Sequence, residues 1–311
     1  MAESPKTSSR RMKIGLIAGL EENGFGGKTP HYRDLQALAL AAEQVGFDSF
    51  WLADHFIYRT PDEEVGQWEV FTFLAGIAAA TSRIAVGPLV ACTSFREPAL
   101  LAKMADSLDE ISEGRFILGL GAGWHEPEYT AFGFPFDHRA GRFEEALQII
   151  VPLLREGHVD FSGQYYQVRN SVLRPRGPTS RGPSVWIGAS RPRMLELTAQ
   201  HADAWNTAWF DAPEQVEKNY ALMLEACQKV GRDPATLELT VGTLTHVLAP
   251  GESPKPDEKA IIGTAEEVAE RLHAFAALGV SHMVVQTEPT DLEGVERFAA
   301  VLDLLDKANT P

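Results

Sequence analysis

The sequence contains few cysteines, no excess of basic residues and no long hydrophobic run. Its two cysteines, Cys92 and Cys227, are too few for a disulfide framework and lack the spacing of metal ligands. Reduced cysteines are typical of the cytoplasm, which is the location we expect. The formal net charge of -15 disfavours nucleic acid and anionic membranes, because both are bound through dense Lys/Arg faces. We therefore expect neither as a partner.

No apolar run approaches the length of a membrane span. The first run, "KIGLIAGL" at residues 13–20, is closed by Glu21 and Glu22 and has no small-residue cleavage site. It suits a first buried strand better than a signal peptide. We expect residues 1–11 to form a disordered tail and residues 12–311 to form one domain.

Short apolar runs alternate with helical stretches along the rest of the chain. After the first run, Leu35, Leu38 and Ala42 recur at helical spacing and Gly46 supplies a stop. Seven further strand-like runs follow, at residues 47–56, 83–93, 115–124, 184–189, 203–209, 237–249 and 280–288. The helical stretches between and after them are residues 68–81, 97–114, 142–157, 191–202, 212–231, 264–279 and 292–308.

Eight strand-helix pairs predict an α/β fold with parallel strands and right-handed crossovers. Eight such units in about 250–300 residues are typical of a (β/α)8 TIM barrel. A doubly wound open sheet is the alternative, but it would not need eight units. The rhythm pauses at about residues 158–183, where a hairpin around Gly163 and an Arg/Pro/Gly-rich loop predict an insertion after the fourth helix.

In a TIM barrel, the residues that follow the strands form the active-site face. The second strand, "SFWLADHF", ends in Asp54 and His55, whose side chains should point to opposite sides of the strand. One can face the barrel mouth while the other holds the loop. His55 is the candidate catalytic residue, because an imidazole can donate to a ligand or shuttle a proton. The alternative is that Asp54 binds loop amides and His55 is merely buried.

Two further strand ends carry small residues. In "GLGAGWHEPE", Gly121 and Gly123 could let a flat ligand approach the backbone, or could serve only the geometry of a turn. Trp124 could wall the pocket. In "IGASRPRM", the start of a helix at Ser190 suits a phosphate, or Ser190 is an ordinary N-cap.

Four stretches together resemble the luciferase-like monooxygenase superfamily, in its coenzyme F420-dependent (deazaflavin) branch. They are "EQVGFDSFWLADHF", "SFREPALLAKMADSLDEISEGRFILGLGAGWHEPEY", "RFEEALQIIVPLLREG" followed by "FSGQYY", and "VWIGASRPRMLELTAQHADAWN". The resemblance implies a flavin or deazaflavin in the barrel mouth, with His55 beside the reactive carbon of its ring. It also implies a bulged third strand with a non-prolyl cis peptide bond near Leu89–Val90, behind the ring, and cofactor phosphates near Ser190.

The resemblance and the rim positions together define a candidate cofactor site. Besides the catalytic His55, its predicted members are Asp54, Leu89, Val90, Cys92, Gly121, Gly123, Trp124, Gly188, Ala189 and Ser190. No metal ligand is predicted. Sugar-phosphate dehydrogenases of this branch carry a glutamate where this chain has Trp124, so glucose 6-phosphate is disfavoured. We expect a more apolar pocket, for which six aromatic residues are available: Trp51, Phe56, Trp68, Trp124, Trp186 and Trp209.

The leading hypothesis is F420-dependent hydride transfer to or from a small organic substrate. The alternative is a two-component monooxygenase that uses reduced FMN (FMNH2) and O2, because the two cofactors share a ring shape. A metal-dependent barrel hydrolase and a non-catalytic flavin binder are weaker alternatives. Barrels of this family commonly pair, and the apolar segment "FTFLAGIAAAT" suggests a homodimer interface.

Overall fold

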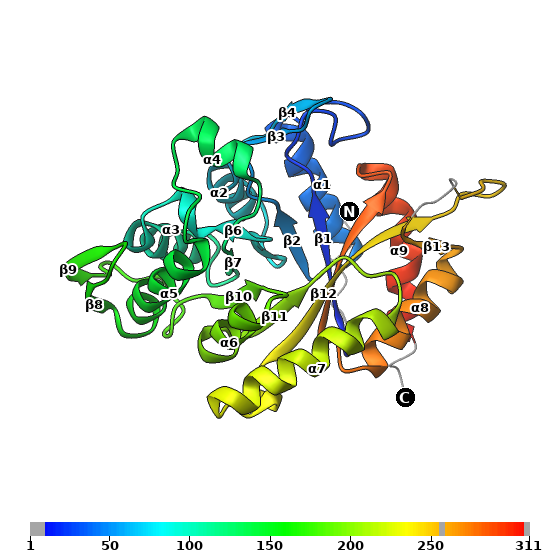
Figure 1. Ribbon diagram of the computed structural model, residues 1–311. Coiled ribbons are helices and arrows are strands. Elements are labelled where there is room, and N and C mark those ends of the chain that lie inside the picture. Colours follow the sequence, from blue (N-terminus) through cyan, green and yellow to red (C-terminus); the bar gives the residue numbers. More distant parts are fainter. Residues whose placement is uncertain (1–9, 255–258, 308–311) are drawn as a thin grey trace.

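The computed structural model describes residues 10–254 and 259–307, which fold around a ring of parallel strands (Figure 1). The ring strands are β1 Lys13–Ala18, β2 Ser49–Leu52, β5 Ala85–Pro88, β6 Ala91–Cys92, β7 Ile117–Gly121, β10 Ser184–Gly188, β11 Ala204–Thr207, β12 Glu238–Val247 and β14 His282–Glu288. Their order is β5-β2-β1-β14-β12-β11-β10-β7-β6.

The barrel is closed by its third strand, which consists of the two halves β5 and β6. The first half pairs with β2 and the second half pairs with β7, while a bridge between Val86 and Phe116 joins the first half to the β7 side. Counting the two halves as one strand leaves eight positions around the ring. The predicted (β/α)8 barrel is confirmed.

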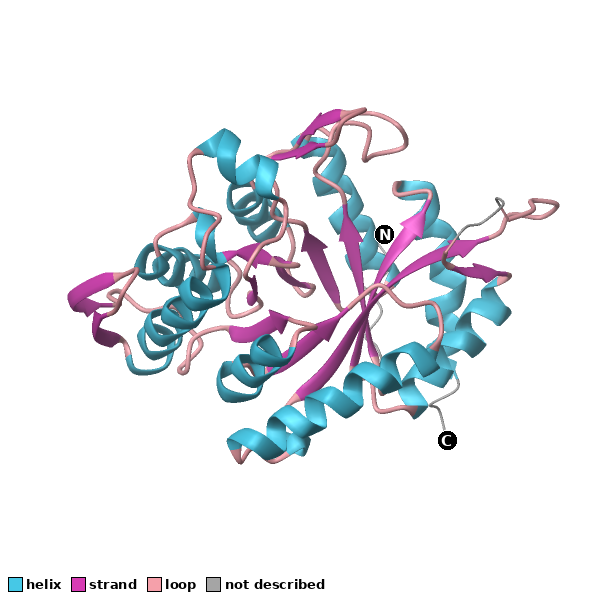
Figure 2. Ribbon diagram, in the orientation of Figure 1, coloured by secondary structure: helices cyan, strands magenta, loops and turns pink. Residues whose placement is uncertain are grey.

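Helices surround the strands on the outside (Figure 2). They are α1 Tyr32–Val45, α2 Val70–Ala80, α3 Pro98–Ile111, α4 Glu126–Phe132, α5 Arg139–Glu156, α6 Pro192–His201, α7 Pro213–Val230, α8 Ala265–Ala277 and α9 Leu292–Lys307. Helix α1 shows the predicted helix pattern, because Leu35, Leu38 and Ala42 are buried and Gly46 ends the helix with φ 102°. None of the described helices is long and apolar enough to cross a membrane.

Several short elements lie outside the eight repeating units. The hairpin of β8 His158–Ser162 and β9 Gln167–Val172 falls in the predicted insertion, and β13 Ile261–Gly263 pairs with β12. Two 3-10 helices span Thr93–Phe95 and Pro234–Thr236. The sequence did not predict α4 or the hairpin of β3 Ile57–Arg59 and β4 Glu64–Gly66. Helix α4 and the β3–β4 hairpin lie next to each other above the barrel (Figure 1).

The predicted tail falls mostly outside the described residues, which begin at Arg10. Arg10 is only 8% exposed and forms ion pairs with Asp48 and Asp306. It also donates to the carbonyl of Gly46. Arg10 therefore packs against the barrel, and does not belong to a disordered tail.

Two tryptophans fill the interior of the barrel. The rings of Trp51 and Trp186 lie 4.6 Å apart, and both side chains are buried. A Cβ atom on Gly15 would lie 2.6 Å from Nε1 of Trp51, and one on Gly87 would lie 2.9 Å from its Cζ3. The two glycines thus make room for the indole. The barrel is packed below its mouth, and a ligand has to bind at the strand ends.

A buried histidine borders this interior core. Nε2 of His282 lies 2.7 Å from Oγ of Ser49, which in turn accepts a 2.6 Å hydrogen bond from Nε1 of Trp51. Burial, together with the charges of Lys13 and Arg10, lowers the pKa of His282 to about 3. His282 is therefore neutral in the folded protein near neutral pH.

We expect His282 to make the protein less stable in acid. An unfolded histidine has a pKa of about 6.5, so the unfolded chain takes up the proton first as the pH falls from about 6.5 towards 3. Stability should fall across this window, by about 2–3 kcal/mol from this residue at a pH of about 4.5. Urea unfolding at about pH 7 and about pH 4.5 should show a smaller acid loss in His282→Gln than in the wild type. The exposed His158, changed to Gln, is the control, and an equal acid loss in all three proteins would contradict the assignment.

Candidate functional site

A cavity of about 1070 Å³ lies at the carboxyl ends of the barrel strands. This volume is slightly above the range that small-molecule sites offer, about 300–1,000 Å³. All eleven predicted site residues line it: Asp54, His55, Leu89, Val90, Cys92, Gly121, Gly123, Trp124, Gly188, Ala189 and Ser190. Whether each of them contacts a cofactor stays a prediction.

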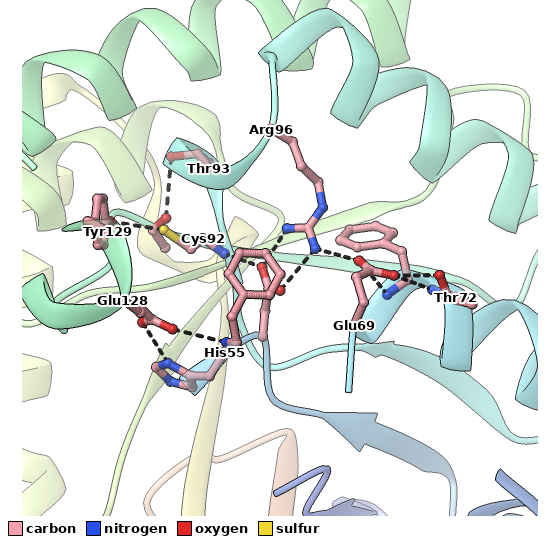
Figure 3. Close-up of polar contacts among 12 residues, drawn as sticks. His55, Glu69, Thr72, Cys92, Thr93, Arg96, Glu128 and Tyr129 are labelled. Atoms are coloured by element: carbon pink, nitrogen blue, oxygen red, sulfur yellow. Dashed lines mark hydrogen bonds and ion pairs between the residues drawn. The ribbon is translucent and has the colours of Figure 1, made fainter. Parts of the chain in front are cut away.

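His55 lies in the loop after β2 and is held by a buried carboxylate. Its Nδ1 is 2.9 Å from Oε1 of Glu128, whose side chain is 1% exposed. Oε2 of Glu128 accepts from the amide of Phe56 at 3.1 Å. Figure 3 shows the imidazole turned towards Glu128. Because a carboxylate oxygen accepts, Nδ1 carries the hydrogen, and Nε2 of the neutral ring is left as an acceptor.

The sequence did not identify Glu128 as part of the site. Glu128 lies in the first turn of α4, within a stretch that was interpreted only as a glycine turn and a pocket wall. The β3–β4 hairpin also holds this helix. The backbone N–H of Arg59, on β3, donates to Nε2 of His125, the N-cap residue of α4, at 3.0 Å. Three signals in "HEPEYTAFG" could have indicated a short helix there: the acidic first turn, Pro127 within that turn and Gly133 directly after the helix.

Two aromatic side chains form a wall beside His55. The ring of Tyr58, on β3, lies 4.5 Å from the imidazole at 38°, and Trp124 meets the imidazole edge-on at 5.8 Å. Burial raises the pKa of Tyr58 to about 12, and the charges of Glu21 and Glu128 act in the same direction. The Tyr58 phenol is therefore protonated at any working pH and can donate a hydrogen bond.

Asp54 holds the rim together from inside the protein. The residue is 2% exposed and accepts from both terminal nitrogens of Arg96, at 2.7 and 3.0 Å, and from the amide of Cys92 at 2.9 Å. Arg96 also donates to Glu69, which caps α2 by accepting from the amide of Thr72 (Figure 3). Strand β2 ends at Leu52, so Asp54 and His55 lie in the loop after it and the predicted strand alternation does not apply to them. Asp54 nevertheless binds the protein framework, while His55 lines the cavity beside Glu128.

The third strand is interrupted at the floor of the cavity. The peptide bond between Leu89 and Val90, which joins β5 to β6, is cis, at the position that the resemblance implies. A second non-prolyl cis bond, Ala208–Trp209, lies in the cavity wall and was not predicted.

The glycines after the fourth strand are required by protein packing. A Cβ atom on Gly121 would lie 2.7 Å from Cγ2 of Val90. Gly123 has φ 73°, and a Cβ atom there would lie 1.8 Å from the hydroxyl of Tyr129. Whether the two glycines also let a flat ligand approach the backbone stays a prediction. The turn-geometry alternative accounts for them, although both residues still line the cavity.

Cys92 is unsuited to act as a nucleophile. Its Sγ lies 3.0 Å from the hydroxyl of Tyr129 (Figure 3), and burial raises the pKa of the thiol to about 12. A thiol that remains protonated has little nucleophilic character.

The phosphate end predicted at Ser190 lies before the first turn of α6. The N-cap of α6 is Arg191, with no side-chain cap hydrogen bond, so the alternative of a Ser190 N-cap is wrong. Ser190 and Arg191 are exposed on the cavity, and Arg139 also lines it. Arg193, by contrast, pairs with Glu144 at 2.5 Å and does not line the cavity.

The aromatic lining is smaller than expected. Of the six aromatic residues proposed to line the pocket, only Trp124 and Trp209 do so. Trp51 and Trp186 belong instead to the barrel interior. Within residues 10–254 and 259–307, no group of three or more His, Cys, Asp and Glu side chains could hold a metal ion.

The sequence matches the luciferase-like monooxygenase family over residues 12–253. Among curated proteins it is 28% identical to the pyrimidine monooxygenase RutA of Klebsiella pneumoniae subsp. pneumoniae, over 95% of this chain and 87% of that protein. Two solved structures share the fold. An F420-dependent secondary alcohol dehydrogenase in complex with an F420-acetone adduct gives a TM-score of 0.78 at 20% identity, covering 94% of this chain and 99% of the other. Riboflavin lyase RcaE with modified FMN and riboflavin gives a TM-score of 0.79 at 14% identity, covering 96% and 92%.

We expect Glu128→Gln to misplace the hydrogen on His55. Glutamine has one accepting oxygen where glutamate has two, so it cannot accept from both Nδ1 of His55 and the backbone N–H of Phe56 in the same way. The tautomer with its hydrogen on Nδ1 should therefore no longer be the only one. Nitrogen NMR of histidine-labelled protein reports the tautomer directly. Turnover, once a substrate is found, should fall about a hundredfold, the size of a proton-transfer contribution.

The matched control for this experiment is Glu126→Gln, an exposed glutamate of the same helix. It should leave both the NMR signals and turnover unchanged. If Glu128→Gln keeps the wild-type His55 signals, the ion pair does not set the tautomer and the assignment fails.

Proposed function

This chain belongs to the luciferase-like monooxygenase family, and from that premise we propose that it uses reduced FMN and O2 to oxygenate a small organic molecule. The observation that carries the proposal is the cavity in the barrel mouth, with His55 oriented on its wall by Glu128. A family enzyme needs such a site for a flat cofactor and a substrate side by side.

The residues present suit a flavin in three respects. The floor at Leu89 and Val90 is apolar, which suits the face of a flat ring. Gly188 and Ala189 are small and lead to Ser190 and the start of α6, where helix amides without helical partners favour a phosphate. Arg191, exposed at the same place, adds a positive charge. A reduced flavin bound here would supply the electrons that activate O2.

The chain's own groups would then orient the substrate and exclude water. His55 can accept a proton or a hydrogen bond at Nε2, while Nδ1 stays bound to Glu128. Tyr58 and Trp124 cover the imidazole, and the buried phenol can donate a hydrogen bond without losing its proton. The barrel below is filled by Trp51 and Trp186, so the reactants are confined to the mouth.

The choice of FMN over F420 reverses the order suggested by the sequence alone. The relative named above is called a monooxygenase and is similar over most of both chains. The likeness to the F420-dependent dehydrogenase, at 20% identity, bears on the fold alone.

F420-dependent hydride transfer is the second candidate. It is favoured by the cations Arg139, Arg191 and Lys259 in the cavity lining of an otherwise acidic protein. Such cations suit the anionic tail that distinguishes F420 from FMN.

Binding of the two cofactors separates these candidates. Fluorescence titration of the purified chain should show a Kd for reduced FMN of about 1 µM or less, and binding of F420 at least about tenfold weaker. Tighter binding of F420 would replace the proposal by its alternative, and binding of neither would overturn both. Oxygen uptake in the presence of reduced FMN is the next assay.

A pair of arginine variants tests the position of the phosphate. Arg191→Ser should weaken FMN about tenfold or more, because it removes a charge-assisted contact, and should leave riboflavin, which has no phosphate, unchanged. Arg193→Ser, which removes an arginine paired outside the cavity, should change neither. Equal effects of the two variants would place the phosphate elsewhere.

A further inference from the structure

One cavity residue has polar atoms that the protein leaves unsatisfied. Gln67 follows β4 and lines the cavity. Its Oε1 and Nε2 atoms are both buried, and neither has a hydrogen-bond partner in the protein. More than nine in ten buried polar groups are paired, so an unpaired amide beside a ligand cavity requires an explanation.

The backbone holds Gln67 in this position. The backbone N–H of Gln67 donates to the carbonyl of Phe56 at 2.9 Å, and the backbone of Gln67 forms a β-bridge with that of Glu21. Only the side-chain torsions can adjust, and the terminal torsion of a glutamine is soft. The amide can therefore turn towards a bound molecule while its backbone stays fixed.

Tyr58 does not satisfy this amide. Burial and the charge of Glu21 raise the pKa of Tyr58, and the nearby Gln67 side chain acts in the opposite direction. The contact nevertheless lacks the geometry of a hydrogen bond, since both amide atoms stay unpaired.

The neighbours of Gln67 on the cavity wall offer complementary groups. Glu21 has a carboxylate that accepts and is folded against Gly24, where a Cβ atom would lie 2.6 Å from its carboxyl carbon. Tyr58 has a hydroxyl that remains protonated. The ring centroids of Tyr58 and Trp124 lie 6.1 Å apart in the same wall, with the rings tilted by 37°, and such aromatic side chains suit a flat molecule.

We propose that Glu21, Tyr58 and Gln67 form the substrate subsite, and that the substrate is a planar cyclic amide or imide. A glutamine amide presents an acceptor beside a donor. It therefore pairs through two hydrogen bonds with a ring edge that carries N–H beside C=O. A ring holds these two groups on one side, whereas an open-chain secondary amide is trans and turns them to opposite sides. The proposal rests on the proposed function, since it assigns the substrate of the same site.

The test compares two probes of one ring shape. Uracil carries the N–H and C=O edge, and 1,3-dimethyluracil lacks both N–H groups. Calorimetric titration of the full chain, with and without FMN, should show uracil binding about tenfold or more tightly than the methylated ring. No measurable binding of uracil, or equal binding of the two probes, would overturn the subsite.

Variants separate recognition from a structural role. Gln67→Met removes both polar atoms at similar volume, and it should abolish the preference for uracil while FMN binding stays unchanged. Without ligand, the Tm of this variant should lie between the wild-type value and about 2 °C above it, because the variant no longer buries an unpaired amide. Gln200→Met, an exposed residue on α6, is the matched control and should behave as wild type.

Three results distinguish the possible failures. A retained uracil preference in Gln67→Met, or a Tm lowered by several degrees, would show that Gln67 is structural and overturn the subsite. If the wild-type protein prefers uracil but does not bind FMN, the proposed function is overturned and the subsite stands.

Discussion

The geometry of the cavity depends on one buried carboxylate, that of Asp54. Its oxygens bind Arg96 and the amide of Cys92, which joins the end of β2 to the end of β6. Arg96 extends the connection to Glu69 and hence to the start of α2. A buried pair of this kind is costly to break, by about 3–5 kcal/mol when one partner is removed. The rim therefore behaves as one piece.

His55 gains its position from this network and its orientation from another part of the chain. It follows Asp54 directly, so the anchor of Asp54 sets the position of its backbone. Glu128, on α4, then fixes the ring. The adjacent carboxylate and imidazole at the end of the second strand thus divide the work. Asp54 holds the protein together, and His55 is turned to the cavity with one nitrogen left to accept.

The sequence predicted the repeating units and the hairpin after the fourth helix, but it missed the short elements in the loops after β2 and β7. Eight strand-helix pairs allow few topologies, and a barrel brings all strand ends to one face, so the strand-end residues converge as expected. Glu128, Tyr58 and Gln67 lie on short elements within loops. A three-residue strand or a seven-residue helix gives too little periodicity to be recognised. Their function also depends on contacts across the fold, which spacing along the chain cannot reveal.

The cavity divides into a floor built by the barrel and a wall built by the loops. Leu89, Val90 and Gly188 belong to the strand ends, whereas Tyr58 and Gln67 come from the β3–β4 hairpin, which lies over the barrel mouth beside α4 (Figure 1). In TIM barrels such loops vary from enzyme to enzyme, whereas catalytic residues come from the strand ends.

The charges follow the same division. Two arginines of the lining lie at helix starts, Arg139 at that of α5 and Arg191 at that of α6. The wall beside His55 carries the carboxylates of Glu21 and Glu128. An anionic group is attracted to the first region and repelled by the second. On the proposed function, these charges would draw a cofactor phosphate towards the arginines and leave the carboxylates to accept from the N–H groups of a neutral substrate.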